Sequence, residues 1–118
     1  MYKLSIDSFD LMITNGDDME IDKIITKMKN DIKNKQYDMV PTFKNRNSKR
    51  KYGLTQIDIE DYILSLKSTD LYKGPIVDRD YINDELYIFK KEIIKNIIFY
   101  TKIKIKNNQL KILSCHED

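Results

Sequence analysis

Cysteine, histidine, glycine and proline are scarce in this sequence, and tryptophan is absent. The single cysteine has no partner for an internal disulfide, which favours a reducing, cytoplasmic location. One cysteine and one histidine argue against a structural zinc site, and we expect neither a metal nor another cofactor. The three glycines, Gly16, Gly53 and Gly74, lie too far apart to form a glycine-rich phosphate-binding loop.

Long apolar runs are also missing. No stretch approaches the roughly 20 apolar residues that a membrane-spanning helix needs, and the opening segment MYKLSIDSFD lacks the apolar block of a signal peptide. We therefore expect no membrane partner. With 41% hydrophobic and 34% charged residues, the chain of 118 residues is predicted to form one soluble domain with a single core.

The net charge of +2 conceals a segregation of acidic and basic residues. The N-terminal stretch is acidic and contains Asp7, Asp10, Asp17, Asp18, Glu20 and Asp22. The segment FKNRNSKRKYG has no acid and contains Lys44, Arg46, Lys49, Arg50 and Lys51. A second basic region has Glu92 as its only acid among Lys90, Lys91, Lys95, Lys102, Lys104 and Lys106. Such patches suit nucleic-acid phosphates, although a solvated lysine-rich surface explains them equally well from charge alone.

Helical signals occupy the first half of the chain. A capping-box pattern predicts a helix that begins near Asp17, with apolar residues at helical spacing at Ile21, Ile24, Ile25, Met28 and Ile32. Thr55, followed by Asp58, predicts a second helix start, with a buried stripe of Ile59, Tyr62, Ile63 and Leu66. The basic segment from Phe43 to Tyr52 is either a loop or a weak helix. Residues 1–16 would form an N-terminal arm or edge strand, and residues 17–118 the folded domain.

The second half of the chain has the alternating pattern of strands. ELYIF, NIIFYTKIKI and LKILSCH are predicted strands, and KNNQ is predicted to turn the chain between the last two. Earlier, YDMV before Pro41 is a short strand or extended segment. DLYKGPIVDRD is predicted to be a loop, because Gly74-Pro75 breaks any helix or central strand. The resulting fold class is α+β: two to three helices followed by an antiparallel β-meander, in a single domain.

Lysine, tyrosine and histidine side chains of this second half are candidates for chemistry: Tyr72, Lys73, Tyr100, Lys102, Lys104 and His116. Such groups can cleave RNA without a metal, because a base can remove the 2′-hydroxyl proton while cations stabilise the charged transition state. A solvated sheet face is the simpler explanation for the lysines. Cys115 and His116 are unsuited to act as a nucleophile pair, because adjacent strand residues point to opposite faces.

The register of the last hairpin decides whether these residues can meet. A two-residue turn, Asn107-Asn108, would place Phe99 opposite His116, on the other face from Tyr100. A three-residue turn would place Tyr100 opposite His116. Only this second register, or a β-bulge, would bring Tyr100, Lys102 and His116 to one side of the sheet.

Several short motifs resemble those of the MqsR-like toxins of bacterial type II toxin–antitoxin systems. The resemblance covers about two thirds of the chain, from Tyr37 onward, and rests on Gly53-Leu54-Thr55, on Tyr72-Lys73-Gly74-Pro75 with Asp78 and Asp80, and on Ser114-Cys115-His116-Glu117. It implies a fold similar to RelE-type ribonucleases and an mRNA-cleaving toxin, acting on free or ribosome-bound mRNA, that a cognate antitoxin neutralises. The chain departs from the family pattern at Thr42, where a basic residue is expected, and at Cys115, which replaces an aromatic residue.

The resemblance also implies roles for individual residues. Lys73 matches the lysine of the family's Tyr-Lys segment, Tyr100 matches a tyrosine on the penultimate strand, and His116 falls where some members have a terminal basic residue. We therefore expect Lys73, Tyr100, Lys102 and His116 to be catalytic, with RNA contacts from Tyr72, Arg46, Lys49, Arg50, Lys51 and Lys104. Asp84 or Glu85 lies nearest to a polar strand residue that some members supply.

The sequence is also compatible with two other functions. The chain could be a non-catalytic RNA- or protein-binding module that retains the toxin fold. It could also be a DNA-binding regulator, if Arg46 to Leu66 formed a helix-turn-helix, although direct DNA binding is not what we expect.

Overall fold

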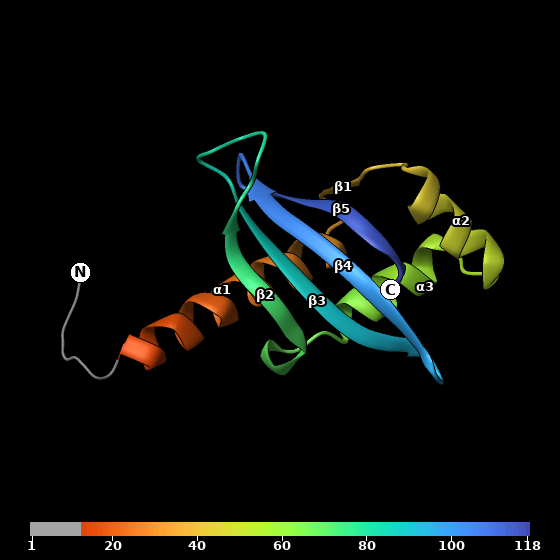
Figure 1. The fold of residues 1–118 in the computed structure, drawn as a ribbon, viewed down its shortest axis with the longest axis horizontal. Helices are drawn as coiled ribbons and strands as arrows, with labels where there is room; N and C mark the ends of the chain where they lie inside the picture. Colours follow the sequence, from red (N-terminus) through yellow and green to blue (C-terminus); the bar gives the residue numbers. More distant parts are fainter. Residues whose placement is uncertain (1–12) are drawn as a thin grey trace.

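A five-stranded mixed sheet with helices against one face makes up residues 13–118, the part of the chain that the computed structural model describes (Figure 1). The elements in chain order are α1 (Ile13–Lys33), β1 (Tyr37–Met39), α2 (Phe43–Lys51), α3 (Gln56–Leu64), a 3₁₀ turn (Ser68–Asp70), β2 (Leu71–Val77), β3 (Glu85–Ile94), β4 (Ile97–Lys106) and β5 (Gln109–Glu117). This order confirms the predicted α+β class.

The sheet has the strand order β1-β5-β4-β3-β2. Strands β2 to β5 are neighbours in chain order and pair antiparallel, as the predicted meander requires. Strand β1 differs, because it lies parallel to β5 and makes the sheet mixed. The prediction of a purely antiparallel meander was therefore incomplete. Strand β1, which follows α1 in the chain, is an edge strand of the sheet and pairs with β5, the last strand of the chain.

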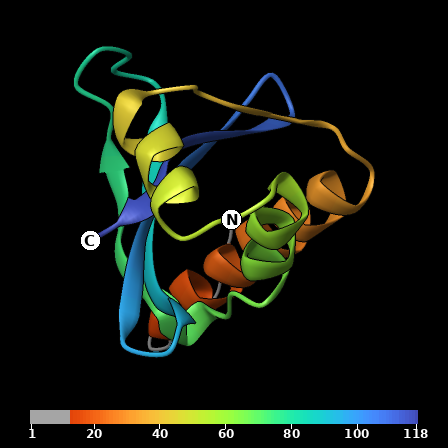
Figure 2. The same ribbon diagram turned by 90° about the vertical axis from the view of Figure 1, so that its right-hand side faces the viewer.

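The core lies between the sheet and the helices α1 and α3, which cover one face of the sheet (Figure 2). Met28, Ile32, Ile59 and Ile63 from the helices pack against Phe89, Phe99, Ile103 and Ile112 from the strands. These residues confirm the predicted helical stripes, and Phe99 and Ile103 form the inward face of β4. The opposite face of β3 and β4 carries no helix within residues 13–118 (Figure 1), and we call it the outer face.

The helix starts agree with the prediction at α3 and differ at α1. At α3, Thr55 Oγ1 accepts a hydrogen bond from the Asp58 N–H at 3.2 Å, and the Asp58 carboxylate accepts one from the Thr55 N–H at 2.8 Å, which confirms the capping box. Helix α1 begins at Ile13, so Asp17 lies inside the helix and the predicted start was wrong. Aspartate is tolerated within helices, so a capping pattern alone does not place a helix end. Residues 1–12 of the predicted arm lie outside the described part.

The segment DLYKGPIVDRD is mostly strand rather than loop. Residues Leu71–Val77 form β2, an edge strand that pairs with β3 and has two irregularities in its register. An edge strand tolerates Pro75, because a missing N–H on the open side costs no ladder hydrogen bond. Gly74 has a φ of +138°, and a Cβ atom there would lie 2.7 Å from the Leu86 carbonyl oxygen. Glycine therefore allows β2 to approach β3 closely.

Candidate functional site

The β4–β5 hairpin contains a β-bulge that brings Tyr100 opposite His116. The turn has two residues, Asn107 and Asn108, with φ values of 53° and 60°, as expected for a type I′ turn. The pairing then shifts by one residue at Leu113, and the pairs on either side of the shift are Ile103 with Ile112 and Lys102 with Ser114. The bulge thus brings Tyr100 and His116 to the same face of the sheet, which a two-residue turn without a bulge would not do.

Helix α2 holds this bulged strand in place. The side-chain amide of Asn45 donates hydrogen bonds to the carbonyl oxygens of Val40 at 2.8 Å and Leu113 at 3.3 Å, and its Oδ1 accepts one from the Cys115 N–H at 2.8 Å. Ser48 Oγ accepts a hydrogen bond from the Glu117 N–H at 2.9 Å. Both α2 side chains are buried. They take the place of a neighbouring strand along the C-terminal half of β5, where β1 no longer pairs.

A groove of about 850 Å³ separates α2 from the outer face of β4 and β5. Its α2 side consists of Thr42, Phe43, Lys44, Asn47 and Ser48, and its sheet side consists of Tyr100, Lys102, Ser114 and His116. Glu117 and Asp118 also line it. A volume of this size is within the usual range for a small-molecule or nucleotide site.

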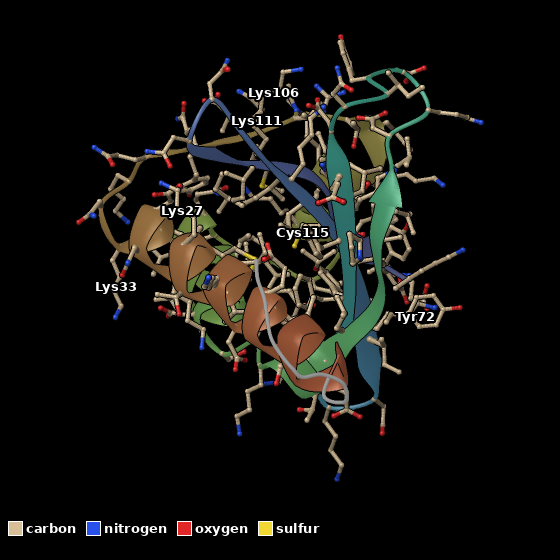
Figure 3. All side chains as sticks on the ribbon, turned by 90° about the vertical axis from the view of Figure 1, so that its left-hand side faces the viewer. Lys27, Lys33, Tyr72, Lys106, Lys111 and Cys115 are labelled. Carbon is tan, nitrogen blue, oxygen red and sulfur yellow. The ribbon has the colours of Figure 1, made fainter. Side chains whose placement is uncertain are left out.

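One row of aromatic and basic side chains crosses the outer face from β2 to β5. Lys90 Nζ lies 3.9 Å from the ring centroid of Tyr72, which projects from the face opposite the buried Cys115 (Figure 3). Lys90 is paired with Tyr100 in the β3–β4 ladder, so the two side chains share one face. The rings of Tyr100 and His116 stack, with centroids 5.5 Å apart and planes inclined by 19°. Lys90 also pairs with the Asp118 carboxylate at 3.2 Å.

A second row runs beside the first and includes Lys73. In the ladder, Lys73 is the partner of Ile88, Ile88 is the partner of Lys102, and Lys102 is the partner of Ser114. Paired residues of antiparallel strands place their side chains on the same face, so Lys73 and Lys102 both lie on the outer face. The pairing shift between Leu71 and Lys73 explains why Tyr72 and Lys73 share this face although they are adjacent.

The imidazole of His116 has one nitrogen engaged by the backbone. Its Nδ1 lies 3.0 Å from the carbonyl oxygen of Glu117. A carbonyl oxygen only accepts hydrogen bonds, so, of the two neutral tautomers, this contact favours the one with the proton on Nδ1. Nε2 is then the ring nitrogen with a free lone pair, which is the form that a general base requires.

Lys104 was predicted to contact RNA, but its side chain is buried and holds the β2–β3 loop. With 5% of its surface exposed, it pairs with Asp78 at 3.0 Å and Asp84 at 2.9 Å. Lys106 pairs with Asp84 at 2.8 Å, and the Tyr81 ring lies over both ammonium groups. Burial opposes the charge of Lys104, but the hydrogen bonds to Asp84 and Asp78 outweigh it and raise the pKa of Lys104. The hydrogen bonds from Lys106 and then Lys104 lower the pKa of Asp84.

The acidic residues that follow β2, Asp78 and Asp80, make contacts within the β2–β3 loop and with the lysine beneath it. The Asp80 N–H donates to Asp78 Oδ1 at 2.9 Å, and Asp78 pairs with Lys104. Asp78 therefore forms a turn and an ion pair within this loop. Asp84 belongs to the same network, so it is held away from the groove.

The basic residues predicted on α2 point in different directions. Arg46 and Lys49 line a separate pocket of about 450 Å³ on the other side of the helix, where Lys49 Nζ donates to Gln56 Oε1 at 2.7 Å. Lys51 pairs with Glu117 at 2.8 Å, and Arg50 is exposed. The predicted RNA track along these residues is thus divided between two sides of α2.

Four groove residues were not selected as site residues from the sequence: Phe43, Lys44, Asn47 and Ser114. Lys90, which lies beside Tyr100 on the outer face, was not selected either. Lys90 lies two residues after Ile88, so the strand alternation of ELYIFKK, extended past Phe89, could have found it. Phe43 and Asn47 lie one helical turn apart, but that spacing becomes visible only once α2 is known to be a helix.

Other arrangements considered from the sequence receive less support. The exposed residues of α3 include Asp58 and Asp61, and carboxylates there would repel DNA phosphates in a helix-turn-helix. Cys115 is buried, which raises the pKa of its thiol to about 11, while His116 lies on the outer face. Among residues 13–118, no three His, Cys, Asp or Glu side chains gather as a metal site would need, and no helix there could cross a membrane.

The fold and site define an α+β domain with a basic, aromatic sheet face beside a groove. Comparisons with protein-family models, with curated protein sequences and with solved structures found no match for this chain.

Proposed function

We propose that this protein is a RelE-like, metal-independent endoribonuclease that cleaves mRNA as the toxin of a type II toxin–antitoxin system. The observation that carries the proposal is the gathering of Lys73, Tyr100, Lys102 and His116, from three strands, on one open sheet face beside a groove. The MqsR-like motifs of the sequence support the same class. Its partners would be mRNA, free or on the ribosome, and a cognate antitoxin.

The proposed reaction uses the 2′-hydroxyl of the RNA as the nucleophile. His116 Nε2 removes the 2′-hydroxyl proton, the 2′-oxygen forms a bond to the adjacent phosphorus, and the bond to the 5′-oxygen breaks. The Tyr100 hydroxyl supplies a proton to the departing 5′-oxygen, which leaves a 2′,3′-cyclic phosphate and a 5′-hydroxyl. Lys73 and Lys102 lie in the neighbouring row, where their ammonium groups stabilise the charge that develops on the phosphate.

Cleavage of mRNA by the purified protein in EDTA, with and without ribosomes, tests this proposal. We expect 5′-hydroxyl ends, and we expect Lys73→Ala, Tyr100→Phe and His116→Gln each to slow cleavage by about 100-fold or more. Lys23→Ala is the matched control, because this exposed lysine lies on α1, on the other side of the sheet. In cells, Lys73→Ala should also relieve growth arrest while the protein stays folded. Absence of cleavage under both conditions would refute the proposal.

One observation favours a second candidate, a non-catalytic RNA-binding module with the same fold. Asp84, which with Glu85 lies nearest to the polar strand residue of the family, is bound to Lys104 and Lys106 instead of facing the groove. A module of this kind would bind RNA tightly and release it uncut, so binding and cleavage measured on one RNA separate the two candidates.

A further inference from the structure

Phe43 is an exposed aromatic residue at the edge of a basic groove. It is the first residue of α2, 70% of its surface is exposed, and it lines the groove opposite Tyr100 and His116. Exposed apolar side chains are common singly, so exposure alone has no functional meaning. The position of Phe43 is more informative, since its wall also contains Lys44 and the facing wall contains Lys102.

The neighbours of Phe43 on α2 complete a surface suited to a nucleotide. Asn47 lies one helical turn further on, and residues four apart on a helix lie one above the other on the same face. Its exposed side-chain amide offers both a donor and an acceptor, as the edge of a nucleobase does. Lys44 adds a cation beside them for a phosphate.

We infer that Phe43 and Asn47 form the base-recognition wall of the groove, where a nucleobase of single-stranded RNA stacks on the Phe43 ring. The inference rests on the proposed function, because it adds a substrate contact to the same groove. A stacked base covers the exposed ring, and its edge faces the Asn47 amide one turn away. The facing wall holds the phosphate next to this base, near Lys102 and the Tyr100–His116 stack.

The same geometry selects single strands over duplexes. In a duplex both faces of every base are covered by its neighbours, so no base is free to stack on a side chain. An unpaired base has a free face, and stacking on aromatic residues is the usual way in which proteins hold single-stranded RNA. The attack of a 2′-oxygen in line with the departing 5′-oxygen also requires a strand that can leave A-form geometry.

Equilibrium binding of 2′-O-methyl RNA tests the inference, since this RNA lacks the attacking hydroxyl and stays intact on the active protein. The probes are a fluorescent single strand of mixed sequence and the same strand in a duplex. The variants are Phe43→Ala, Phe43→Trp, and Ile57→Ala as the control, because Ile57 is a similarly exposed apolar residue on α3, outside the groove. Thermal unfolding of each variant verifies that it is folded.

We expect Phe43→Ala to weaken single-strand binding by roughly 5- to 150-fold, the range typical for loss of one stacked base. Phe43→Trp should retain binding, Ile57→Ala should match the wild type, and the duplex should bind weakly with no response to Phe43→Ala. Unchanged single-strand binding by Phe43→Ala, or tighter binding of the duplex, overturns the inference.

The two proposals fail in different ways. Binding that depends on Phe43, without cleavage of unmodified RNA, supports the inference and refutes the nuclease. Cleavage that is unaffected by Phe43→Ala supports the nuclease and refutes the inference. Absence of any RNA binding refutes both.

Discussion

Replacement of Asn45 by alanine should destabilise the protein far more than replacement of Asn47, two residues further along the same helix. Asn45 is 1% exposed and joins α2 to the bulged part of β5, whereas Asn47 is exposed. Both substitutions exchange the same side chain within one short helix. The difference between them therefore isolates the hydrogen bonds of Asn45.

The magnitude follows from the groups that Asn45→Ala leaves unpaired. The Cys115 N–H is the most costly, because Cys115 is fully buried and a buried unpaired donor costs about 1–3 kcal/mol. The hydrogen bonds to the Val40 and Leu113 carbonyl oxygens contribute about 0.5–1.5 kcal/mol each. The better helix propensity of alanine returns about 0.5 kcal/mol. We expect a net loss of about 1.5–5.5 kcal/mol.

Urea unfolding measures this loss, as a shift of the midpoint at unchanged m-value. Asn47→Ala should stay within about 0.5 kcal/mol of the wild type, as is usual for surface substitutions. The backbone N–H of Cys115 should exchange with solvent slowly in the wild type and faster in Asn45→Ala, which would show that the lost stability arises at this hydrogen bond. If both variants unfold at the same urea concentration, the stabilising role that we assign to Asn45 is refuted.

Three further predictions concern other parts of the molecule. The ion pairs of Asp84 with Lys106 and Lys104 hold the pKa of its carboxyl group below the ordinary value of 3.8. These pairs therefore stabilise the fold fully when the pH is above 3.8, and their contribution is lost as the pH falls through the lowered pKa. The stability advantage of the wild type over Asp84→Asn should thus be largest near neutral pH and shrink below about pH 4, and a constant gap in urea unfolding would contradict it. The thiol of Cys115, buried and with a pKa raised to about 11, should resist a thiol reagent at pH 8 until the protein unfolds. Gly74→Ala should destabilise the protein by more than about 1 kcal/mol, because its Cβ would lie 2.7 Å from a backbone oxygen. Gly53→Ala is the control, because Gly53 also has a positive φ but a Cβ atom there would have nothing within 4 Å. If both variants lowered the unfolding temperature equally, the close approach of β2 to β3 would not be the cause of the destabilisation.

Local patterns in the sequence were sufficient for much of the fold. The capping box of α3 and the alternation of β4 are properties of a few adjacent residues, so they could be predicted from the sequence and agree with the structure. The predicted start of α1 was wrong, because the local pattern at Asp17 is compatible with both the start and the interior of a helix. Burial of one face explains why the strand alternation was reliable.

Contacts between distant segments decided the rest. The segment around Pro75 became a strand because it lies at a sheet edge, which no local pattern reveals. Lys104 shares the face of Tyr100 by alternation, but Asp78 and Asp84 fold over it and remove it from the site.

The fold class and the helical stripes could be predicted from the amino-acid sequence alone, because they depend on composition and on short-range periodicity. That Tyr100 and His116 share a face depends on contacts between distant parts of the chain. Their register depends on a bulge at Leu113, which the two-residue turn does not specify. Asn45 and Ser48, which lie about 70 residues earlier, supply the hydrogen bonds that hold that strand. Such a contact exists only after α2 and β5 have come together.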